Sequence, residues 1–109
     1  MSLLAPLEAA KIAKLLPLMF KFRLYIAGDA QNSGQAIANL TAICREYLPG
    51  RHQIELVDVF LEPKRALADG ILMTPTLIKL TPAPVRRIVG NLSQRAPVLH
   101  AVGLEMLPA

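Results

Sequence analysis

Hydrophobic and polar residues alternate over residues 20–27, and this period of two predicts a strand. One face would carry Phe20, Phe22, Leu24 and Ile26, and the other Lys21, Arg23, Tyr25 and Ala27. After a polar loop, 28–32, Ser33 is placed to cap a helix that Pro49 and Gly50 end. The buried stripe of this helix has helical spacing: Ile37, Leu40, Cys44, Tyr47 and Leu48.

The next apolar run, Ile54–Leu61, is almost continuous around Asp58. Such a run predicts a strand buried on both faces beside a parallel neighbour. The first half therefore indicates a right-handed strand–helix–strand unit. Pro63 fits the first turn of a short helix, Lys64–Asp69, and Gly70 closes it.

The second half predicts two short strands, Thr76–Leu80 and Val85–Val89, joined by a proline-rich segment. Ser93 could cap a last helix whose apolar positions are Val98, Leu99 and Val102. This order of elements indicates an α/β protein with a thioredoxin-like fold. Pro75, directly before the third strand, lies where that fold places its cis-proline.

The chain has 109 residues, enough for one domain. We expect an N-terminal extension at 1–19, the domain at 20–104 and a tail at 105–109. Within the extension, Ile12, Leu15, Leu16 and Met19 have helical spacing, but Pro17 interrupts them. A frayed extension is favoured over an oligomer-capping or membrane-surface helix, and no membrane span is predicted.

Hydrophobic residues make up 53% of the chain and aromatic residues only 5%, so the core must be aliphatic. This excess of aliphatic surface suggests a homo-oligomer or a buried partner interface. The net charge of +4 is mild, and no tryptophan or long basic run accompanies it, so nucleic-acid binding is not expected. A single cysteine fits a reducing cytoplasm.

Residue types that carry chemistry are present but isolated. The loop 28–33 has no cysteine, whereas a thioredoxin-like redox enzyme needs a Cys-x-x-Cys pair there. Cys44 lies about 15 Å further along the helix by helical rise. His52 and His100 lack a second ligand nearby, and Ser33 lacks a His/Asp partner. We therefore expect no catalytic site, cofactor or metal.

Three X-Pro bonds, at Pro75, Pro82 and Pro84, lie within ten residues. Such bonds prefer trans by only about 0.5–1 kcal/mol and isomerise slowly, so this segment could hold two backbone arrangements. Arg86 and Arg87 would point to opposite faces of a strand. From the residues alone, they are equally well explained as partner contacts or as solvated edge charges.

Several segments together resemble the KaiB family of circadian-clock proteins. The resemblance covers roughly residues 22–104, and its most specific part is the run from Pro84 to Ser93. Its segments are Leu24–Gly28, Asn32-Ser33, Val57–Val59, Pro63, Ile71-Leu72, Thr74–Leu77, Lys79 and Pro84–Ser93.

The resemblance implies a non-enzymatic timing protein that forms tetramers or dimers in a ground-state fold and converts slowly to a thioredoxin-like monomer. That monomer would bind the KaiC ATPase ring and modulate its phosphorylation cycle. A KaiA-like protein and a sensor histidine kinase are further implied partners. The residues that the resemblance implies in partner binding are Lys79, Arg86, Arg87 and Asn32. The residues that it implies in conformational switching are Pro75, Pro82, Pro84 and Gly90.

The chain departs from the family pattern at three places near this run. Ala83 replaces the middle one of three prolines, Asn91 replaces an aspartate, and Ala96 stands where the last helix usually has a capping glutamate. These departures indicate a divergent paralogue. The alternative is a stand-alone thioredoxin-like sensor or adaptor module that docks a histidine kinase or stress-signalling partner.

Overall fold

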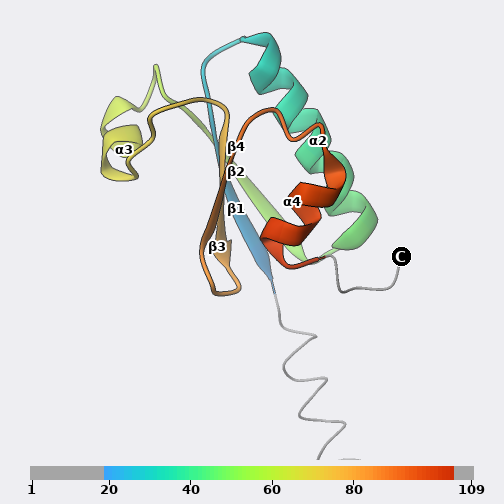
Figure 1. Ribbon diagram of the computed structural model, residues 1–109. Helices are drawn as coiled ribbons and strands as arrows, with labels where there is room; N and C mark the ends of the chain where they lie inside the picture. The colour runs from blue at the N-terminus through green and yellow to red at the C-terminus, as the bar shows by residue number, and fades with distance from the viewer. Residues whose placement is uncertain (1–18, 105–109) are drawn as a thin grey trace, which may run out of the picture.

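The computed structural model describes residues 19–104, which form a single sheet with helices on both faces (Figure 1). Helices α2 and α4 cover one face, and α3 lies on the other. Residues 1–18 of the expected N-terminal extension and the tail 105–109 lie outside the described residues. The elements are β1 (Phe20–Ile26), α2 (Gln31–Tyr47), β2 (His52–Asp58), α3 (Pro63–Ala68), β3 (Thr76–Thr81), β4 (Arg86–Val89) and α4 (Arg95–Val102).

The strand order is β2-β1-β3-β4, and β1 lies parallel to β2. β3 runs antiparallel to β1, and β4 antiparallel to β3. The predicted strand–helix–strand unit, short helix, strand pair and last helix are therefore all confirmed. Within residues 19–104, no helix is long and apolar enough to cross a membrane.

The main core lies between the sheet and helices α2 and α4. It contains the apolar face of β1, which the alternation predicted. The buried stripe of α2 and Val98 and Val102 of α4 pack against this face. A smaller core of Tyr25, Val57, Ala66 and Ile78 lies on the α3 side. Burial on this second face explains why Tyr25, at a position expected to be polar, is fully inaccessible.

The prediction for the second strand is wrong in two respects. The strand is His52–Asp58, and residues 59–61 leave it in a turn where Leu61 and Glu62 donate backbone N–H groups to Asp58 O. It is also an edge strand in which only Val57 is buried. The reason is that β3 pairs with the other side of β1, so β2 is left with one neighbour.

Neither serine predicted to cap a helix does so. α2 begins at Gln31 without a side-chain cap, and the buried Ser33 hydroxyl instead accepts a hydrogen bond from Ala27 N at 3.0 Å. α4 also lacks a side-chain cap, and Ser93 N donates to Asn91 Oδ1 at 3.0 Å. In both cases the serine stabilises the loop that leads into the helix.

The prolines lie where the sequence places them. Pro63 occupies the first turn of α3. The peptide bonds before Pro75, Pro82 and Pro84 are cis, as predicted for Pro75. Pro82 and Pro84 form the hairpin between β3 and β4.

Candidate partner-binding site

The loop between β1 and α2 lies at the position where a thioredoxin-like redox enzyme has its redox centre. It contains Gly28, Asp29 and Ala30, without a cysteine. Cys44 is fully buried in the second half of α2, and burial raises the pKa of its thiol to about 11. A neutral thiol with no access to solvent is a poor nucleophile. The expectation that Cys44 is buried is confirmed.

The histidines and carboxylates do not form a metal site in residues 19–104, where no group of three potential ligands converges. His52 Nδ1 lies 2.7 Å from Leu48 O, a contact that ties the start of β2 to the end of α2. His52 therefore has a structural role.

Lys79 and Arg86 are cross-strand neighbours on the face covered by α2 and α4. Lys79 is only 4% exposed, and no carboxylate pairs with it among the described residues. Burial, followed by the charge of Arg86, lowers the pKa of Lys79. The exposed Arg86 is thus the more accessible of the two cations, and Lys79 presents little surface to a partner in this conformation.

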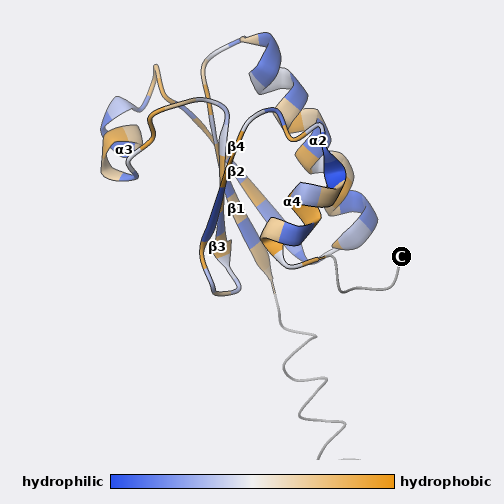
Figure 2. Cartoon of the chain, in the orientation of Figure 1, coloured by the Kyte–Doolittle hydropathy of each residue, from blue (hydrophilic) through white to orange (hydrophobic). Residues whose placement is uncertain are grey.

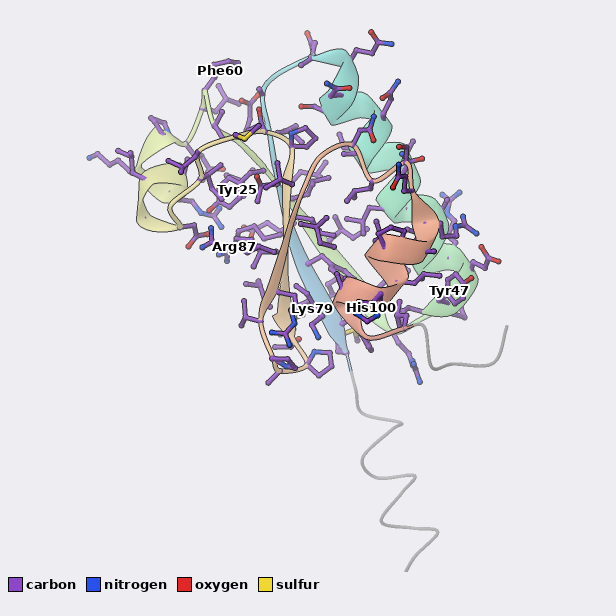
Figure 3. All side chains as sticks on the ribbon, viewed as in Figure 1. Tyr25, Tyr47, Phe60, Lys79, Arg87 and His100 are labelled. Atoms are coloured by element: carbon purple, nitrogen blue, oxygen red, sulfur yellow. The ribbon has the colours of Figure 1, made fainter. Side chains whose placement is uncertain are left out.

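Arg87 lies on the opposite face of the sheet, opposite Ile78 and on the side of α3, as the strand prediction requires. Figure 3 shows Arg87 and Lys79 on the two sides of the sheet. Arg87 contributes to a positive environment that lowers the pKa of Asp69, although hydrogen bonding from Tyr25 is the larger cause. Asn32 is exposed in the first turn of α2, beyond the other end of β1 from Lys79.

The four predicted partner-binding residues therefore do not form one compact site. Lys79 and Arg86 lie on one face of the sheet, and Arg87 lies on the other face. Asn32 lies at the end of the sheet where the β1–α2 loop is. A partner that contacts all of them would have to wrap around the β4 edge of the sheet.

The predicted switch residues fall into two pairs at opposite ends of β3. Pro75 and Gly90 are joined, because Gly90 N donates to Pro75 O at 2.9 Å. Gly90 has φ of +123°, a backbone conformation that only glycine adopts readily. Pro82 and Pro84 lie in the distant β3–β4 hairpin.

A polar contact that the sequence did not reveal ties the β4–α4 loop to α2. Asn91 Nδ2 donates to Gln35 Oε1 at 2.9 Å, and Asn39 Nδ2 donates to Asn91 O at 2.8 Å. Between this contact and α4, Leu92 is buried with φ of +64°. The loop is therefore fixed by side chains from a helix more than fifty positions earlier in the sequence.

A second network missed at the sequence level joins α3 to the sheet. Arg23 donates to Glu55 at 2.8 Å and to Asp69 at 3.0 Å, and Arg65 reaches Glu55 at 2.9 Å. The Tyr25 hydroxyl donates to Asp69, and it lies 3.2 Å from Arg65 O. The Asp69 carboxylate, at the C-terminus of α3, is therefore stabilised by two specific donors, Arg23 and Tyr25.

Comparison with known proteins identifies the family. A KaiB domain model matches residues 23–104, which includes all the described elements except the first three residues of β1. The chain belongs to the KaiB family. It is 45% identical over 86 residues to the circadian clock protein KaiB3 of Synechocystis sp., covering 79% of this chain and 82% of that protein. It is also 45% identical over 85 residues to the circadian clock oscillator protein KaiB of Prochlorococcus marinus strain MIT 9313, covering 78% of this chain and 70% of that protein.

Solved structures show which kind of fold this KaiB-family chain adopts here. Chloroplastic thioredoxin z matches with a TM-score of 0.66 at 20% identity, over 88% of this chain and 86% of that one. The N-terminal domain of Synechococcus elongatus SasA matches with a TM-score of 0.66 at 15% identity, over 84% of this chain and 90% of that one. The predicted thioredoxin-like α/β fold is thus confirmed. The relatives of higher identity are named as clock proteins, not as enzymes.

Proposed function

We propose that this protein is a non-enzymatic timing adaptor that binds a KaiC-type ATPase ring and modulates its phosphorylation cycle. The observation that carries the proposal is the 45% identity to KaiB clock proteins on a thioredoxin-like fold that lacks the redox cysteines. Such a scaffold would act on the ring through its binding surfaces, since the single cysteine of the sequence, Cys44, is buried in α2.

We further propose that slow conversion between a KaiB ground-state fold and the thioredoxin-like fold limits the rate of binding. If the binding form is a minor population, the apparent affinity falls by that fraction. The structural support is that elements of the second half contact the first half through polar groups as well as the main core. Examples are the Asn91–Gln35 bond and the network that joins Asp69 to Arg23.

Arg86, Arg87 and Asn32 are the accessible groups among the proposed partner contacts, and Lys79 would become available only through a change of conformation. Arg86 and Arg87 fit acidic groups of a protein surface, since a guanidinium can bind carboxylates in a bidentate manner. A KaiA-like protein and a sensor histidine kinase are further candidate partners, and a tetramer or dimer is the expected resting assembly.

The test is a time course of binding to the KaiC-type ring of the source organism with an ATP analogue. We expect a complex that forms over hours, with an observed rate that reaches a plateau as ring concentration increases. The plateau is the signature of conversion before binding. No complex after a day would contradict the proposed function, and a rate that keeps rising linearly would contradict slow conversion.

A glycine substitution tests the contribution of the thioredoxin-like conformation. Gly90→Ala should slow complex formation several-fold, because φ of +123° disfavours any side chain even though no atom lies within 4 Å of the added Cβ. Gly34→Ala is the matched control: its Cβ also meets no atom, and the residue lies within α2. Equal rates for the two variants would contradict a role for Gly90 in the switch.

The alternative of a stand-alone sensor module is favoured only by the likeness to the SasA N-terminal domain. At 15% identity, that likeness supports the fold and not the partner. A chain that remains monomeric at all concentrations and binds a sensor kinase, but no KaiC-type ring, would favour this alternative.

A further inference from the structure

A lysine occupies a core position of the sheet. Lys79 is only 4% exposed, and it ends a run of four buried residues that begins β3. It lies two positions after Leu77, and its partners across the neighbouring strands are Phe22 of β1 and Arg86 of β4. Because Leu77 and Phe22 belong to the main core, the Lys79 side chain points to the main-core face. Figure 2 shows hydrophobic colour recurring along β1 and α4, which contribute residues to that core.

The ammonium group of Lys79 has little water around it and no counter-charge. No hydrogen bond or ion pair joins it to any of residues 19–104. In the same range, every fully inaccessible side-chain nitrogen or oxygen has a hydrogen-bond partner, so Nζ must reach the surface. The four-carbon stem is therefore buried, and the charged end extends just far enough to meet solvent.

The charges on this side of the sheet do not compensate Lys79. Arg86 opposite it has the same sign, and after burial its charge is the next cause that lowers the pKa of Lys79. On α2, which covers the same face, the carboxylate of Glu46 pairs with Arg95. Both the loss of water and the neighbouring charge therefore disfavour the charged amine in this position.

Arg23, on the other face, shows how the same fold treats a cation that it does compensate. The Arg23 side chain is 24% exposed, and it has two carboxylate partners, Glu55 at 2.8 Å and Asp69 at 3.0 Å. Lys79 is more deeply buried and has no such partner among the residues that the structure describes. The cost of withdrawing a charge from water is thus offset by partners at Arg23 and left without an offset at Lys79.

We propose that Lys79 restricts the fraction of the chain that adopts the thioredoxin-like conformation. That conformation withdraws the ammonium group from water without giving it a carboxylate, which raises the free energy of this conformation alone. An arrangement of the second half that returns Lys79 to water avoids the penalty and is favoured by it.

Lys79 is then a positioning residue for ring binding, because it acts on the population of the binding form and does not touch the ring. This inference rests on the proposed function, since it takes the thioredoxin-like conformation as the form that binds the KaiC-type ring.

Direct contact of Lys79 with a carboxylate of the ring is the less favourable explanation. Little of its side chain is accessible, and the exposed Arg86 beside it can bind such a carboxylate without a change of conformation. The two explanations predict opposite signs when the charge is removed. Loss of a direct contact weakens binding, whereas loss of a buried, unpaired charge makes binding tighter.

Replacing Lys79 by methionine tests the inference, because methionine keeps an unbranched apolar stem and removes the charge. We expect Lys79→Met to bind the source organism's KaiC-type ring at least threefold more tightly than wild type at equilibrium, since the population of the binding form sets the apparent affinity. Lys79→Arg keeps the charge and should not gain affinity. Lys21→Met is the matched control: it removes the same charge from an exposed position of β1 and should not gain affinity either. A variant that fails to fold cannot imitate the expected gain.

Nuclear magnetic resonance of the free chain gives a readout that does not depend on the ring. The ratio of amide signals from the thioredoxin-like conformation to those from any other conformation should rise at least threefold in Lys79→Met. It should stay unchanged in Lys21→Met. An unchanged ratio in Lys79→Met would overturn the inference. A wild-type chain that shows thioredoxin-like signals alone would also overturn it, because nothing then restricts that conformation.

The outcomes separate this inference from the proposed function. Weaker ring binding by Lys79→Met would overturn the inference in favour of direct contact, and equal binding would leave Lys79 with no effect on the population. Both results leave the function standing. Failure of the wild-type chain to bind the ring would contradict the function, while the signal ratio still decides whether Lys79 restricts the conformation.

Discussion

At the residue scale, several side chains have environments that their sequence neighbours do not explain. Lys79 lies on the main-core face of a central strand, and no carboxylate of residues 19–104 pairs with it. Leu92 is buried in a left-handed backbone conformation that non-glycine residues rarely adopt. Each of these positions carries an unfavourable term that the rest of the fold must offset.

Leu92 allows the two opposing terms to be compared. Leu92→Gly removes backbone strain of about 1–2 kcal/mol, but it also removes a buried side chain whose loss costs about 2–5 kcal/mol. The loss is larger, so we expect the free energy of unfolding to fall by about 2 kcal/mol in denaturant titrations. Leu67→Ala, at an exposed position, should change it by less than about 0.5 kcal/mol. A variant Leu92→Gly as stable as wild type would contradict this, because the relief of strain would then equal the loss of burial.

At the element scale, α3 is the helix least supported by apolar burial. Its six residues bury only Ala66, and the polar network of Tyr25, Arg23, Arg65 and Asp69 supplies much of the remaining contact with the sheet. The main-core helices differ, since α2 and α4 both pack apolar faces onto the sheet.

Removing one hydroxyl should therefore loosen α3. Tyr25→Phe leaves Asp69 with one of its two side-chain donors, Arg23, and should reduce the free energy of unfolding by about 1–2 kcal/mol. Faster hydrogen exchange should appear first in residues 63–70. The matched control is Tyr47→Phe, which removes the same hydroxyl group at a half-buried position of α2. Phe22→Tyr is unsuitable as a control, because it inserts a polar group into the main core.

The same network predicts a pH dependence. Hydrogen bonds from Tyr25 and then from Arg23 lower the pKa of Asp69. A depressed carboxyl pKa stabilises the fold above the ordinary pKa of the group, and this contribution is lost as the pH falls through the lowered value. Acid titration of unfolding should therefore show a smaller loss of stability in Tyr25→Phe than in wild type. An equal loss would mean that Asp69 titrates normally.

At the scale of the whole molecule, the sheet has two open edges, formed by β2 and β4. β4 is only four residues long and carries Arg86 and Arg87, both exposed. Charged residues on an exposed edge oppose pairing with the strands of other molecules. The two arginines can therefore protect the edge and bind a partner, so the explanations that the sequence left open are compatible.

Neutralising this edge should reveal its protective role. With Arg86 and Arg87 both replaced by Val, we expect increased light scattering on incubation at high concentration, because β4 becomes an apolar, β-prone edge. The control replaces two exposed cations away from a sheet edge, Arg45 and Lys64, by Val, which removes the same charge. Equal aggregation of both double variants would assign the effect to net charge.

Periodicity, turn residues and the motif around Pro75 and Arg86 were sufficient to determine the element order, the thioredoxin-like class and the resemblance to KaiB. These features depend on residues within a few positions of one another, so they can be predicted from the sequence. The absence of a Cys-x-x-Cys pair from the loop 28–33 was equally visible, because the sequence has a single cysteine, Cys44.

Only the tertiary structure decided which face each strand buries and which distant groups meet. β2 was expected to be buried on both faces beside a parallel neighbour. The parallel neighbour is β1, but β3 pairs with the other side of β1, so β2 is an edge strand in which only Val57 is buried. The contacts of Asp69 with Tyr25 and of Asn91 with Gln35 span 44 and 56 positions, and no local pattern encodes such pairs. The separation of Lys79, Arg87 and Asn32 has the same cause: strand alternation sets the face of a residue, but the packing of α3 and α4 decides what that face contacts.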